Sequence, residues 1–459
     1  MRSTKKRKIK MILTTAGKAL VPVMLLSGLL TNSLSEDSYP PPVGINPTVA
    51  SLLGGGNFTN GNPYISKDLV YMKTLNVQWT RINLYPNYYY SKDKPVTSHL
   101  EKAMEQMYTH NVSPMLLFEY YGNYEKLGVK IGDYNKWYAI GKEFAQVYRP
   151  NGTWARSRSI QDWGITVFSA FNEPDVENSI PHDKYREALK GLADGVHSVD
   201  PKLKVIPGGF SAQNSFDDWT LRGYGSAVSD LINDGTLDGI DLHTYFDDKY
   251  APLVGTHSNS AQHTFDQIKK QLNIKRDIHF YSTEFNVKNK ASTPNTDEKL
   301  GKQFLTAIWD HLGVVKNDGH TPATQFAMPW SLLLTDEQDK QYGMRGAKEE
   351  EQAMSVRSKV LQLVTSLTTD TSFVSLDPKK KGEYILSGPS HKLWVWQNVR
   401  GWSSKWGTSY QITGIPQHAT EICIYRWNGI WKAFPIEPNT KTITVNGLEK
   451  DETYMFLAR

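Results

Sequence analysis

Residues 164–178 read GITVFSAFNEPDVEN and predict a strand that delivers polar groups to its carboxyl end. Residues 165–168 are β-branched or aromatic, which is typical of a buried strand. Pro174 cannot extend a hydrogen-bonded ladder, so we expect the strand to stop there and leave Asn172 and Glu173 at its mouth. In a parallel barrel this end of the strands carries the reactive groups, and a carboxylate there is placed to donate a proton. Taken alone, the stretch also fits a strand end capped by ordinary polar residues.

A second stretch, residues 277–288 (DIHFYSTEFNVK), is also strand-like and contains a glutamate, Glu284. It lies about 110 residues beyond Glu173, or about three βα units at roughly 35–45 residues per unit. The fourth and seventh strands of one barrel would then each present a glutamate at the same mouth. Two carboxylates about 5 Å apart suit a double-displacement glycosidase, in which one is the acid/base and the other the nucleophile.

The NEP of residues 172–174 and the TEF of residues 283–285 resemble motifs of a glycoside hydrolase superfamily, clan A. Its catalytic glutamates lie on strands four and seven of a (β/α)8 barrel. The resemblance spans residues 43–370, and within the clan the chain is most similar to family 39, in particular to its biofilm-matrix (Psl-type) exopolysaccharide hydrolases. Those relatives join a secreted barrel to a small C-terminal β-domain. The resemblance implies that Glu173 is the acid/base and Glu284 the nucleophile.

Three residues are expected to hold the nucleophile and the sugar. Arg81 lies near the end of the predicted strand at residues 77–84, where a cation would keep Glu284 ionised; a salt bridge on the barrel floor is the alternative. The resemblance implies that Asn172 binds the sugar 2-hydroxyl, a bond that strengthens in an oxocarbenium-like transition state. It also implies that Tyr245 hydrogen-bonds the nucleophile and orients it.

Three further residues are candidates for substrate binding, each with a structural alternative. His243 alternates with Tyr245 on one strand, so both face the same side; His243 could modulate Glu173, contact sugar, or be a satisfied core group. Trp330 ends the predicted eighth strand, where the resemblance implies a ring under the sugar, and plain core packing is the alternative. Glu119 follows the third strand and is a third carboxylate at the mouth, where some relatives have a histidine. The tyrosines at residues 88–90 line outer subsites or are exposed without a role.

From residue 43 the chain alternates strand-like and helix-like runs, which predicts a (β/α)8 TIM barrel over residues 39–370. The Gly-rich residues 53–62 are expected to form a loop and not a nucleotide cradle. Expected strands are residues 43–46, 77–84, 112–118, 165–168, 203–208, 237–245, 277–288 and 325–330.

Residues 371–459 have a different texture, with six or seven short β-like runs separated by turn residues. This pattern predicts an antiparallel β-sandwich. Its tryptophans, Trp394, Trp396, Trp402 and Trp406, either build the core of this domain or bind sugar, and their alternate spacing favours core.

The N-terminus predicts export. Residues 1–10 are strongly basic and residues 19–30 form a short apolar run, which is the pattern of a secretory signal. Residues 31–42 have linker composition, so we assign residues 1–38 to signal peptide and linker and expect a secreted or extracellular protein. The protein would contact a membrane only if the N-terminal segment stayed uncleaved as an anchor. Association with the cell surface is the other alternative to free secretion.

Composition narrows the function classes. The net charge of +5 is partly carried by the first ten residues, so the mature surface is near neutral and no nucleic-acid partner is expected. Cys423 is the single cysteine, which excludes an intrachain disulfide or a cysteine metal cluster. We expect a monomer that needs no metal or organic cofactor.

Together these features predict a retaining glycoside hydrolase that cleaves β-glycosidic bonds of an extracellular polysaccharide. We expect it to be endo-acting, cutting internal bonds of the polysaccharide. The alternatives are an exo-acting, β-xylosidase-like enzyme of the same family and a non-catalytic carbohydrate-binding barrel. The sequence leaves the sugar and the linkage open.

Overall fold

The computed structural model describes residues 48–59, 65–84, 90–91, 94–95, 98–119, 131–176, 180–211, 223–246, 260–289, 296–330, 332–333, 342–345, 354–376, 382–400, 403 and 405–459. The predicted signal segment, the expected first strand at residues 43–46, Tyr88, Tyr89 and Trp402 lie outside these residues, as does the side chain of Tyr90.

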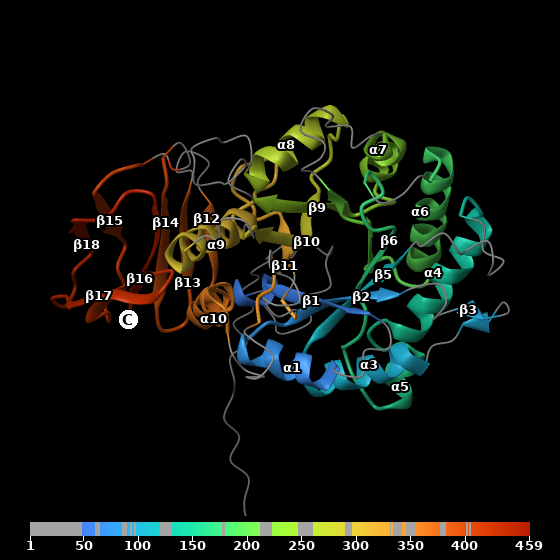
Figure 1. The fold of residues 1–459 in the computed structure, drawn as a ribbon, viewed down its shortest axis with the longest axis horizontal. Coiled ribbons are helices and arrows are strands. Elements are labelled where there is room, and N and C mark those ends of the chain that lie inside the picture. Colours follow the sequence, from blue (N-terminus) through green and yellow to red (C-terminus); the bar gives the residue numbers. More distant parts are fainter. Residues whose placement is uncertain are drawn as a thin grey trace, which may run out of the picture. The chain divides into compact units, whose positions relative to one another are not determined.

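The larger part of the described chain is a barrel of parallel strands, as the sequence predicted (Figure 1). One arc of the barrel has the order β1-β2-β5-β6-β7 and the other the order β11-β10-β9-β8. A parallel bridge between Leu53 and Ala327 joins the first and last strands, while β7 and β8 are successive pieces on the other side. The strands are β1 (Gly54–Thr59), β2 (Trp79–Leu84), β5 (Ser113–Phe118), β6 (Val167–Ala170), β7 (Lys204–Pro207), β8 (Phe210–Ser211), β9 (Gly239–Phe246), β10 (His279–Val287) and β11 (Thr324–Pro329).

Helices connect these strands and pack their apolar faces on the outside of the barrel. Side chains cap the starts of several of them: Asp133, Thr296 and Ser355 each accept a hydrogen bond from the backbone N–H three residues later. None of the helices in the described part of the chain has the length and hydropathy needed to cross a bilayer. The helices are η1 (Ala50–Leu52), α1 (Ile65–Thr74), α3 (Ser98–Thr109), α4 (Tyr134–Tyr148), α5 (Thr153–Ser157), α6 (His182–His197), α7 (Tyr224–Asp234), α8 (Ala261–Gln271), α9 (Asp297–Leu312) and α10 (Val356–Thr368); two short strands, β3 (Tyr90–Ser91) and β4 (Lys94–Pro95), pair after β2.

The first strand corrects the prediction, because β1 falls inside the Gly-rich segment that we expected to be a loop. Close packing explains the glycines. A Cβ at Gly54 would lie 2.7 Å from Met328 Cγ, and a Cβ at Gly55 would lie 2.0 Å from Leu332 Cδ2. Glycine therefore lets this strand approach its neighbours where a larger residue could not.

Seven buried side chains form a separate core cluster inside the barrel, contributed by neighbouring strands of both arcs. They are Trp79, Met115, Val167 and Ile206 on β2, β5, β6 and β7, Tyr281 on β10, and Phe326 and Met328 on β11. These side chains fill the lumen below the strand ends, as in other barrels whose interior is a packed core and not a pore. The strand ends above them are left for polar groups.

The C-terminal strands form two antiparallel sheets that pack face to face as a sandwich. One sheet has the order β12-β13-β14-β19-β16-β17 and the other pairs β15 with β18. Trp394 and Trp396 lie in the core between the sheets, where Trp396 stacks on Tyr410 with ring centroids 4.9 Å apart. Trp406 is 39% exposed. The strands are β12 (Ser372–Leu376), β13 (Glu383–Ser387), β14 (Lys392–Asn398), β15 (Ser409–Thr413), β16 (Glu421–Arg426), β17 (Gly429–Pro435), β18 (Thr442–Asn446) and β19 (Glu452–Ala458).

Direct contacts join the sandwich to α9 of the barrel. Gln397 Nε2 donates to the Thr306 carbonyl at 2.9 Å, and the hydroxyls of Thr306 and Thr453 lie 2.8 Å apart. Lys302 Nζ lies 3.1 Å from a carboxylate oxygen of the buried Glu452. Because these groups are polar and buried, they make the position of the sandwich on α9 specific.

Candidate active site

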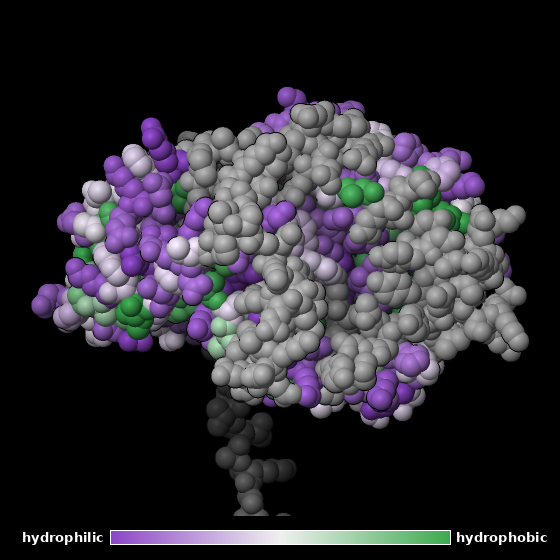
Figure 2. All heavy atoms as spheres, viewed as in Figure 1, coloured by the Kyte–Doolittle hydropathy of each residue, from purple (hydrophilic) through white to green (hydrophobic). Residues whose placement is uncertain are grey.

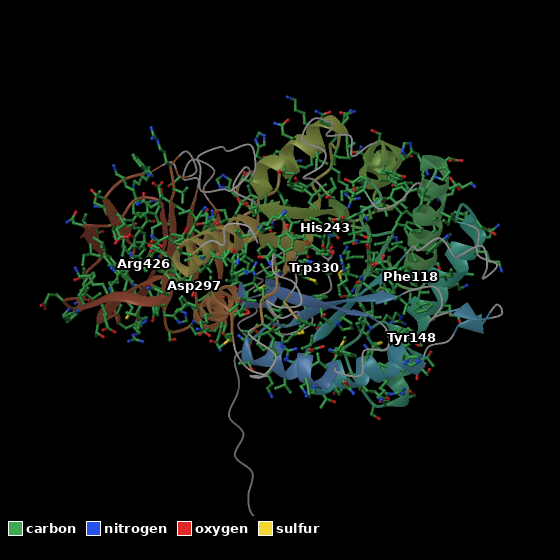
Figure 3. The ribbon with its side chains drawn as sticks, in the orientation of Figure 1. Phe118, Tyr148, His243, Asp297, Trp330 and Arg426 are labelled. Atoms are coloured by element: carbon green, nitrogen blue, oxygen red, sulfur yellow. The ribbon has the colours of Figure 1, made fainter. Side chains whose placement is uncertain are left out.

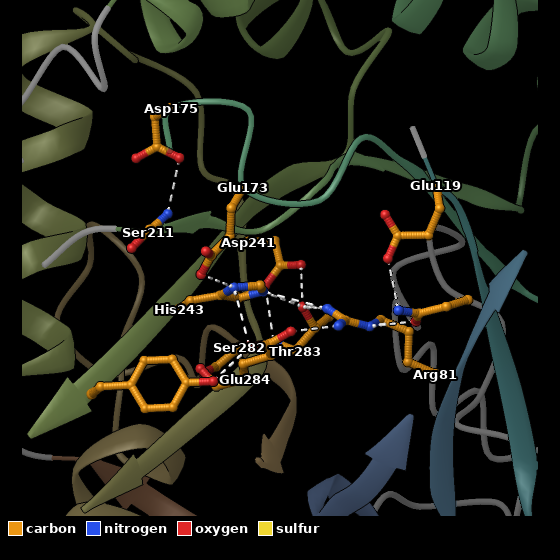
Figure 4. A network of polar contacts seen from close by, with 12 residues as sticks. Arg81, Glu119, Glu173, Asp175, Ser211, Asp241, His243, Ser282, Thr283 and Glu284 are labelled. Atoms are coloured by element: carbon orange, nitrogen blue, oxygen red, sulfur yellow. Dashed lines mark hydrogen bonds and ion pairs between the residues drawn. The ribbon is translucent and has the colours of Figure 1, made fainter. Parts of the chain in front are cut away.

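Polar side chains from five barrel strands or strand ends meet at the mouth (Figure 4). His243 and Trp330 mark this place in Figure 3, and in the same orientation hydrophilic residues predominate between the grey atoms at the centre of Figure 2. The contacts described below connect these side chains into one network.

Glu173 follows β6 in an unusual backbone conformation. Its φ is 38°, and that of Phe171 is 65°, so both residues occupy the left-handed region that non-glycine residues rarely adopt. The Glu173 N–H donates to the Gly209 carbonyl at 3.0 Å, which holds the turn in place. Such strain costs on the order of 1–3 kcal/mol and is found mainly at functional sites. The Glu173 side chain is 15% exposed at the mouth.

His243, on β9, contacts both predicted catalytic glutamates. Its Nδ1 lies 2.8 Å from Glu173 Oε1 and 3.6 Å from Glu284 Oε2. Its Nε2 lies 2.8 Å from Thr283 Oγ1, and the ring is fully buried. Burial alone would lower the pKa of His243, but the adjacent carboxylates outweigh it and raise the pKa to about 9. The adjacent carboxylates thus favour the protonated form of the imidazole.

Glu284, on β10, is held by two donors. Arg81 Nη2 forms a short ion pair with Oε1, and the Tyr245 hydroxyl donates to Oε2 at 2.5 Å. Burial tends to raise the pKa of Glu284, but the charges of His243 and Arg81 and the two hydrogen bonds lower it below its ordinary value. The environment therefore keeps this carboxylate ionised.

Arg81 also connects Glu284 to Glu119. Its Nε donates to Asn83 Oδ1 at 3.0 Å, and Asn83 Nδ2 donates to Glu119 Oε1 at 2.7 Å. The guanidinium is 1% exposed and Glu119 is 3% exposed. Glu119 thus lies next to the network and acts on Glu284 through Asn83 and Arg81. Sequence reasoning missed Asn83, although its alternation with Arg81 on one strand was a signal for it.

Two more residues at the mouth had no predicted role. Thr283 donates its backbone N–H to Asp241 Oδ1 at 2.9 Å and its hydroxyl to Asp241 Oδ2 at 2.7 Å. The same hydroxyl oxygen accepts from Arg81 Nη1 at 2.9 Å. Asp241 lies two residues before His243, so the alternation that revealed Tyr245 would also have revealed Asp241.

The remaining predicted residues lie around this network. Asn172 is buried immediately before Glu173. Trp330 directly follows β11. Its backbone N–H donates to the Phe285 carbonyl at 2.9 Å, and the residue is half-buried. The ring of Tyr342 lies 4.9 Å, centroid to centroid, from that of Tyr245, which makes Tyr342 a neighbour of the site that the sequence did not indicate.

Gly208 and Gly209 allow the turn after β6 and the His243 ring to lie close to the chain after β7. A Cβ at Gly208 would lie 1.9 Å from the Phe171 carbonyl oxygen, and a Cβ at Gly209 would lie 1.9 Å from His243 Nε2. Nearby, the buried Asp175 accepts from the Ser211 N–H at 3.0 Å, and burial raises the pKa of this carboxyl to about 6.

One donor atom each of Glu173, His243 and Glu284 lie within 4.8 Å of one another, so the set could in principle hold a metal ion. The chemistry of the set favours proton transfer instead. Arg81 already brings a positive charge to Glu284, and both imidazole nitrogens of His243 are engaged by oxygen partners. A divalent cation would have to displace these contacts.

Comparisons with known proteins agree with this architecture. No model of a protein family matches the chain, and no curated protein matches it in sequence. Among solved structures, a glucosidase from Croceicoccus marinus has a TM-score of 0.58 at 11% identity, over 89% of this chain and 95% of its own. A family 39 glycoside hydrolase from Bacteroides cellulosilyticus WH2 has a TM-score of 0.58 at 14% identity, over 89% and 81%. A bacterial orthologue of human α-L-iduronidase has a TM-score of 0.58 at 12% identity, over 89% and 80%. At these identities the likeness shows the fold.

Proposed function

We propose that the protein is a retaining glycoside hydrolase with Glu284 as nucleophile and Glu173 as acid/base. The observation that carries the proposal is the separation of the two carboxylates, which bring one oxygen each within 4.8 Å of the other. Retaining enzymes hold their carboxyl groups about 5–5.5 Å apart, whereas inverting enzymes need about 6.5–9.5 Å to admit a water. Glycosidases among the structures of similar fold support the reaction class.

The surroundings of the two glutamates support the assignment of roles. Arg81 and Tyr245 bind Glu284, and its lowered pKa suits a nucleophile that must be ionised. Glu173 is the more exposed of the two and lies farther from Arg81 in the network, so it can exchange protons with a leaving group or water. Different environments for two carboxylates are the usual basis for separate acid/base and nucleophile roles.

The reaction then has two steps. Glu284 attacks the anomeric carbon while Glu173 protonates the departing glycosidic oxygen, which leaves a glycosyl ester on Glu284. In the second step Glu173 takes a proton from water, the water oxygen bonds to the anomeric carbon, and the Glu284 carboxylate departs. The two inversions give net retention. Tyr245 and Arg81 hold Glu284 in position through both steps.

The proposed substrate is an extracellular β-linked polysaccharide, such as a biofilm exopolysaccharide, cleaved within the chain by a secreted enzyme related to family 39. The fold shared with a family 39 glycoside hydrolase supports this class. We infer that Asn172 next to Glu173, Trp330 directly after β11 and Glu119, which accepts from Asn83, bind sugar hydroxyls or a sugar face. Size analysis of the products from a panel of polysaccharides would separate endo from exo action.

Substitution of the two glutamates tests the roles. We expect Glu173→Gln and Glu284→Gln each to lose most activity on polysaccharide. Glu173→Gln should retain turnover of aryl glycosides with good leaving groups, because departure then needs little protonation, whereas Glu284→Gln should not. Glu187→Gln, on the exposed face of α6, is the matched control and should behave as wild type.

NMR of a fresh digest tests the stereochemistry, because the first anomer released should have the configuration of the substrate. An inverted product would mean that water attacks directly and that Glu284 is not a nucleophile. Near-normal rates in both glutamine variants would refute the site. Binding of polysaccharide by a wild-type protein that turns over no glycoside would instead favour the carbohydrate-binding barrel.

A further inference from the structure

The buried residues Asp241 and Thr283 contact the site through His243 and Arg81, and the two-step reaction assigns them no role. Asp241 is 1% exposed and receives both the N–H and the hydroxyl of Thr283. Thr283 is 2% exposed and is itself a neighbour of His243 and Arg81. A buried carboxylate at such a place is costly, so its partners indicate what it does.

Counting the protons shared along the hydrogen bonds from Asp241 through Thr283 to His243 indicates which ring nitrogen of His243 carries a proton. Thr283 Oγ1 has three neighbours: Asp241 Oδ2 at 2.7 Å, His243 Nε2 at 2.8 Å and Arg81 Nη1 at 2.9 Å. A hydroxyl has one hydrogen and two lone pairs, and the guanidinium can only donate. The hydroxyl therefore donates to either the carboxylate or the imidazole and accepts from the other.

The stronger base takes the remaining proton. Imidazole is a stronger base than a carboxylate, so the proton lies on Nε2, which donates to Thr283, while Thr283 donates to Asp241. Arg81 Nη1 also lies 3.4 Å from Nε2, but its shorter contact, 2.9 Å, is with Thr283 Oγ1, which accepts its hydrogen. The bond made by one ring nitrogen sets the form of the other, so Nδ1 is left as the nitrogen that gains or loses a proton. This nitrogen faces Glu173 Oε1 at 2.8 Å.

We propose that Asp241 and Thr283 are positioning residues that fix His243 with a proton on Nε2 and so make Nδ1 the atom that shares a proton with Glu173. The inference rests on the proposed function only for its catalytic consequence. When Nδ1 is protonated it donates to the Glu173 carboxylate; when it is not, it accepts from the Glu173 carboxylic acid. The charge of this pair then determines when Glu173 has a proton for the leaving group.

Every charged group that faces His243 contributes to this balance. Glu173 follows β6, Glu284 lies on β10, Arg81 on β2 and Asp241 on the same strand as the histidine. The more distant Asp175 interacts through its charge. The carboxylates outweigh the guanidinium and the cost of burial, which agrees with the raised pKa of His243. Removing the charge of Asp241 should therefore make protonated His243 less stable.

Nitrogen NMR of the histidines tests the tautomer without any assay of activity. In the full chain with 15N-labelled histidine, the signals absent from His243→Gln identify the ring. We expect Nε2 to stay protonated across the titration while Nδ1 loses its proton. In Asp241→Asn the new amide can donate to Thr283, whose hydroxyl then turns to Nε2, so the neutral ring should carry its proton on Nδ1. A wild-type ring that is deprotonated at Nε2 would overturn the proposal.

The pH profile of kcat/KM tests the consequence for Glu173. Asp241→Asn should move the alkaline limb to lower pH by about one unit or more, the usual effect of one nearby charge. Thr283→Val removes the hydroxyl that links Asp241 to Nε2 and should move the limb in the same direction. Thr283→Ser keeps the hydroxyl and should restore the limb. A uniform loss of rate with an unmoved limb would mean that the pair is merely structural. If Thr283→Val does not fold, the pH profile of Asp241→Asn and the NMR titration still test the proposed role of the pair. If the wild-type protein shows the expected tautomer but is inactive, only the proposed function is refuted.

Discussion

Replacing Arg81 by methionine should remove the cation from a buried carboxylate while keeping an unbranched side chain of similar length. The guanidinium is 1% exposed and binds Glu284, Thr283 and Asn83. Breaking a buried ion pair by removing one partner costs about 3–5 kcal/mol, because the other charge stays buried. We therefore expect Arg81→Met to lower the free energy of unfolding by about that amount at pH 7.

The loss should depend on pH, and the direction follows from Glu284. In the native protein the pKa of Glu284 is lowered, so its contribution to stability is present above its unfolded pKa of about 4.3 and is lost as the pH falls. Without Arg81 the pKa of the buried carboxyl should be higher, because His243 and Tyr245 are then the groups left to stabilise its charge, and the loss of stability should grow as the pH rises. The difference should therefore narrow as the pH falls, and once the pH is below the lowered pKa of Glu284 in the native protein, lost hydrogen bonds should leave about 1–2 kcal/mol.

Urea unfolding followed by tryptophan fluorescence, at pH 7 and near pH 4, measures both differences. Arg158→Met is the matched control, because Arg158 pairs with Glu105 at 2.8 Å on the surface and its side chain is 31% exposed. This control should lose less than about 1 kcal/mol. An equal loss for Arg81→Met at both pH values would refute the reasoning, since it would mean that the ionisation of Glu284 does not depend on the guanidinium.

Two further substitutions test packing and buried charge. Gly209→Ala would place a Cβ 1.9 Å from His243 Nε2 and should lower kcat/KM on an aryl glycoside about 10²-fold, whereas Gly407→Ala, where a Cβ would meet nothing within 4 Å, should not change it. Burial raises the pKa of Glu452 to about 6, so the contribution of this carboxyl to stability is present below about pH 4.3 and is lost as the pH rises to about 6. Glu452→Gln should therefore flatten the pH dependence of Tm between these two values. An unchanged slope would contradict this.

The barrel and the second, antiparallel domain were predictable because each depends on local patterns. Apolar strand runs separated by helical spacing predict parallel βα units, and short runs with turn residues between them predict a sandwich. Polar residues placed after such strands predict the site, because parallel strands bring their carboxyl ends to one edge. Arg81, His243 and the two glutamates were candidates on this ground, and the resemblance to a glycoside hydrolase clan implied Tyr245; the structure brings these five side chains into one network.

The first strand was wrong for a reason that lies outside local patterns. Glycine has low strand propensity, so residues 54–59 predict a loop when they are taken alone. The neighbours decide otherwise, because Met328 and Leu332 occupy the space that side chains at Gly54 and Gly55 would need. Contacts between residues more than 200 positions apart are invisible to a reading of propensity.

The positions of Thr283 and Glu284 depended on the assembled barrel. Side chains alternate along a strand, so neighbouring residues are expected on opposite faces. In β10 the pairing with β9 shifts between Tyr281 and Glu284, which adds one residue to β10. Such a bulge re-aims side chains, and Arg81 binds both Thr283 and Glu284. The residue types at the site follow from the chain itself, whereas strand pairing decides that Asp241, Thr283 and His243 form one proton-sharing chain, because register is a property of two strands and not of one.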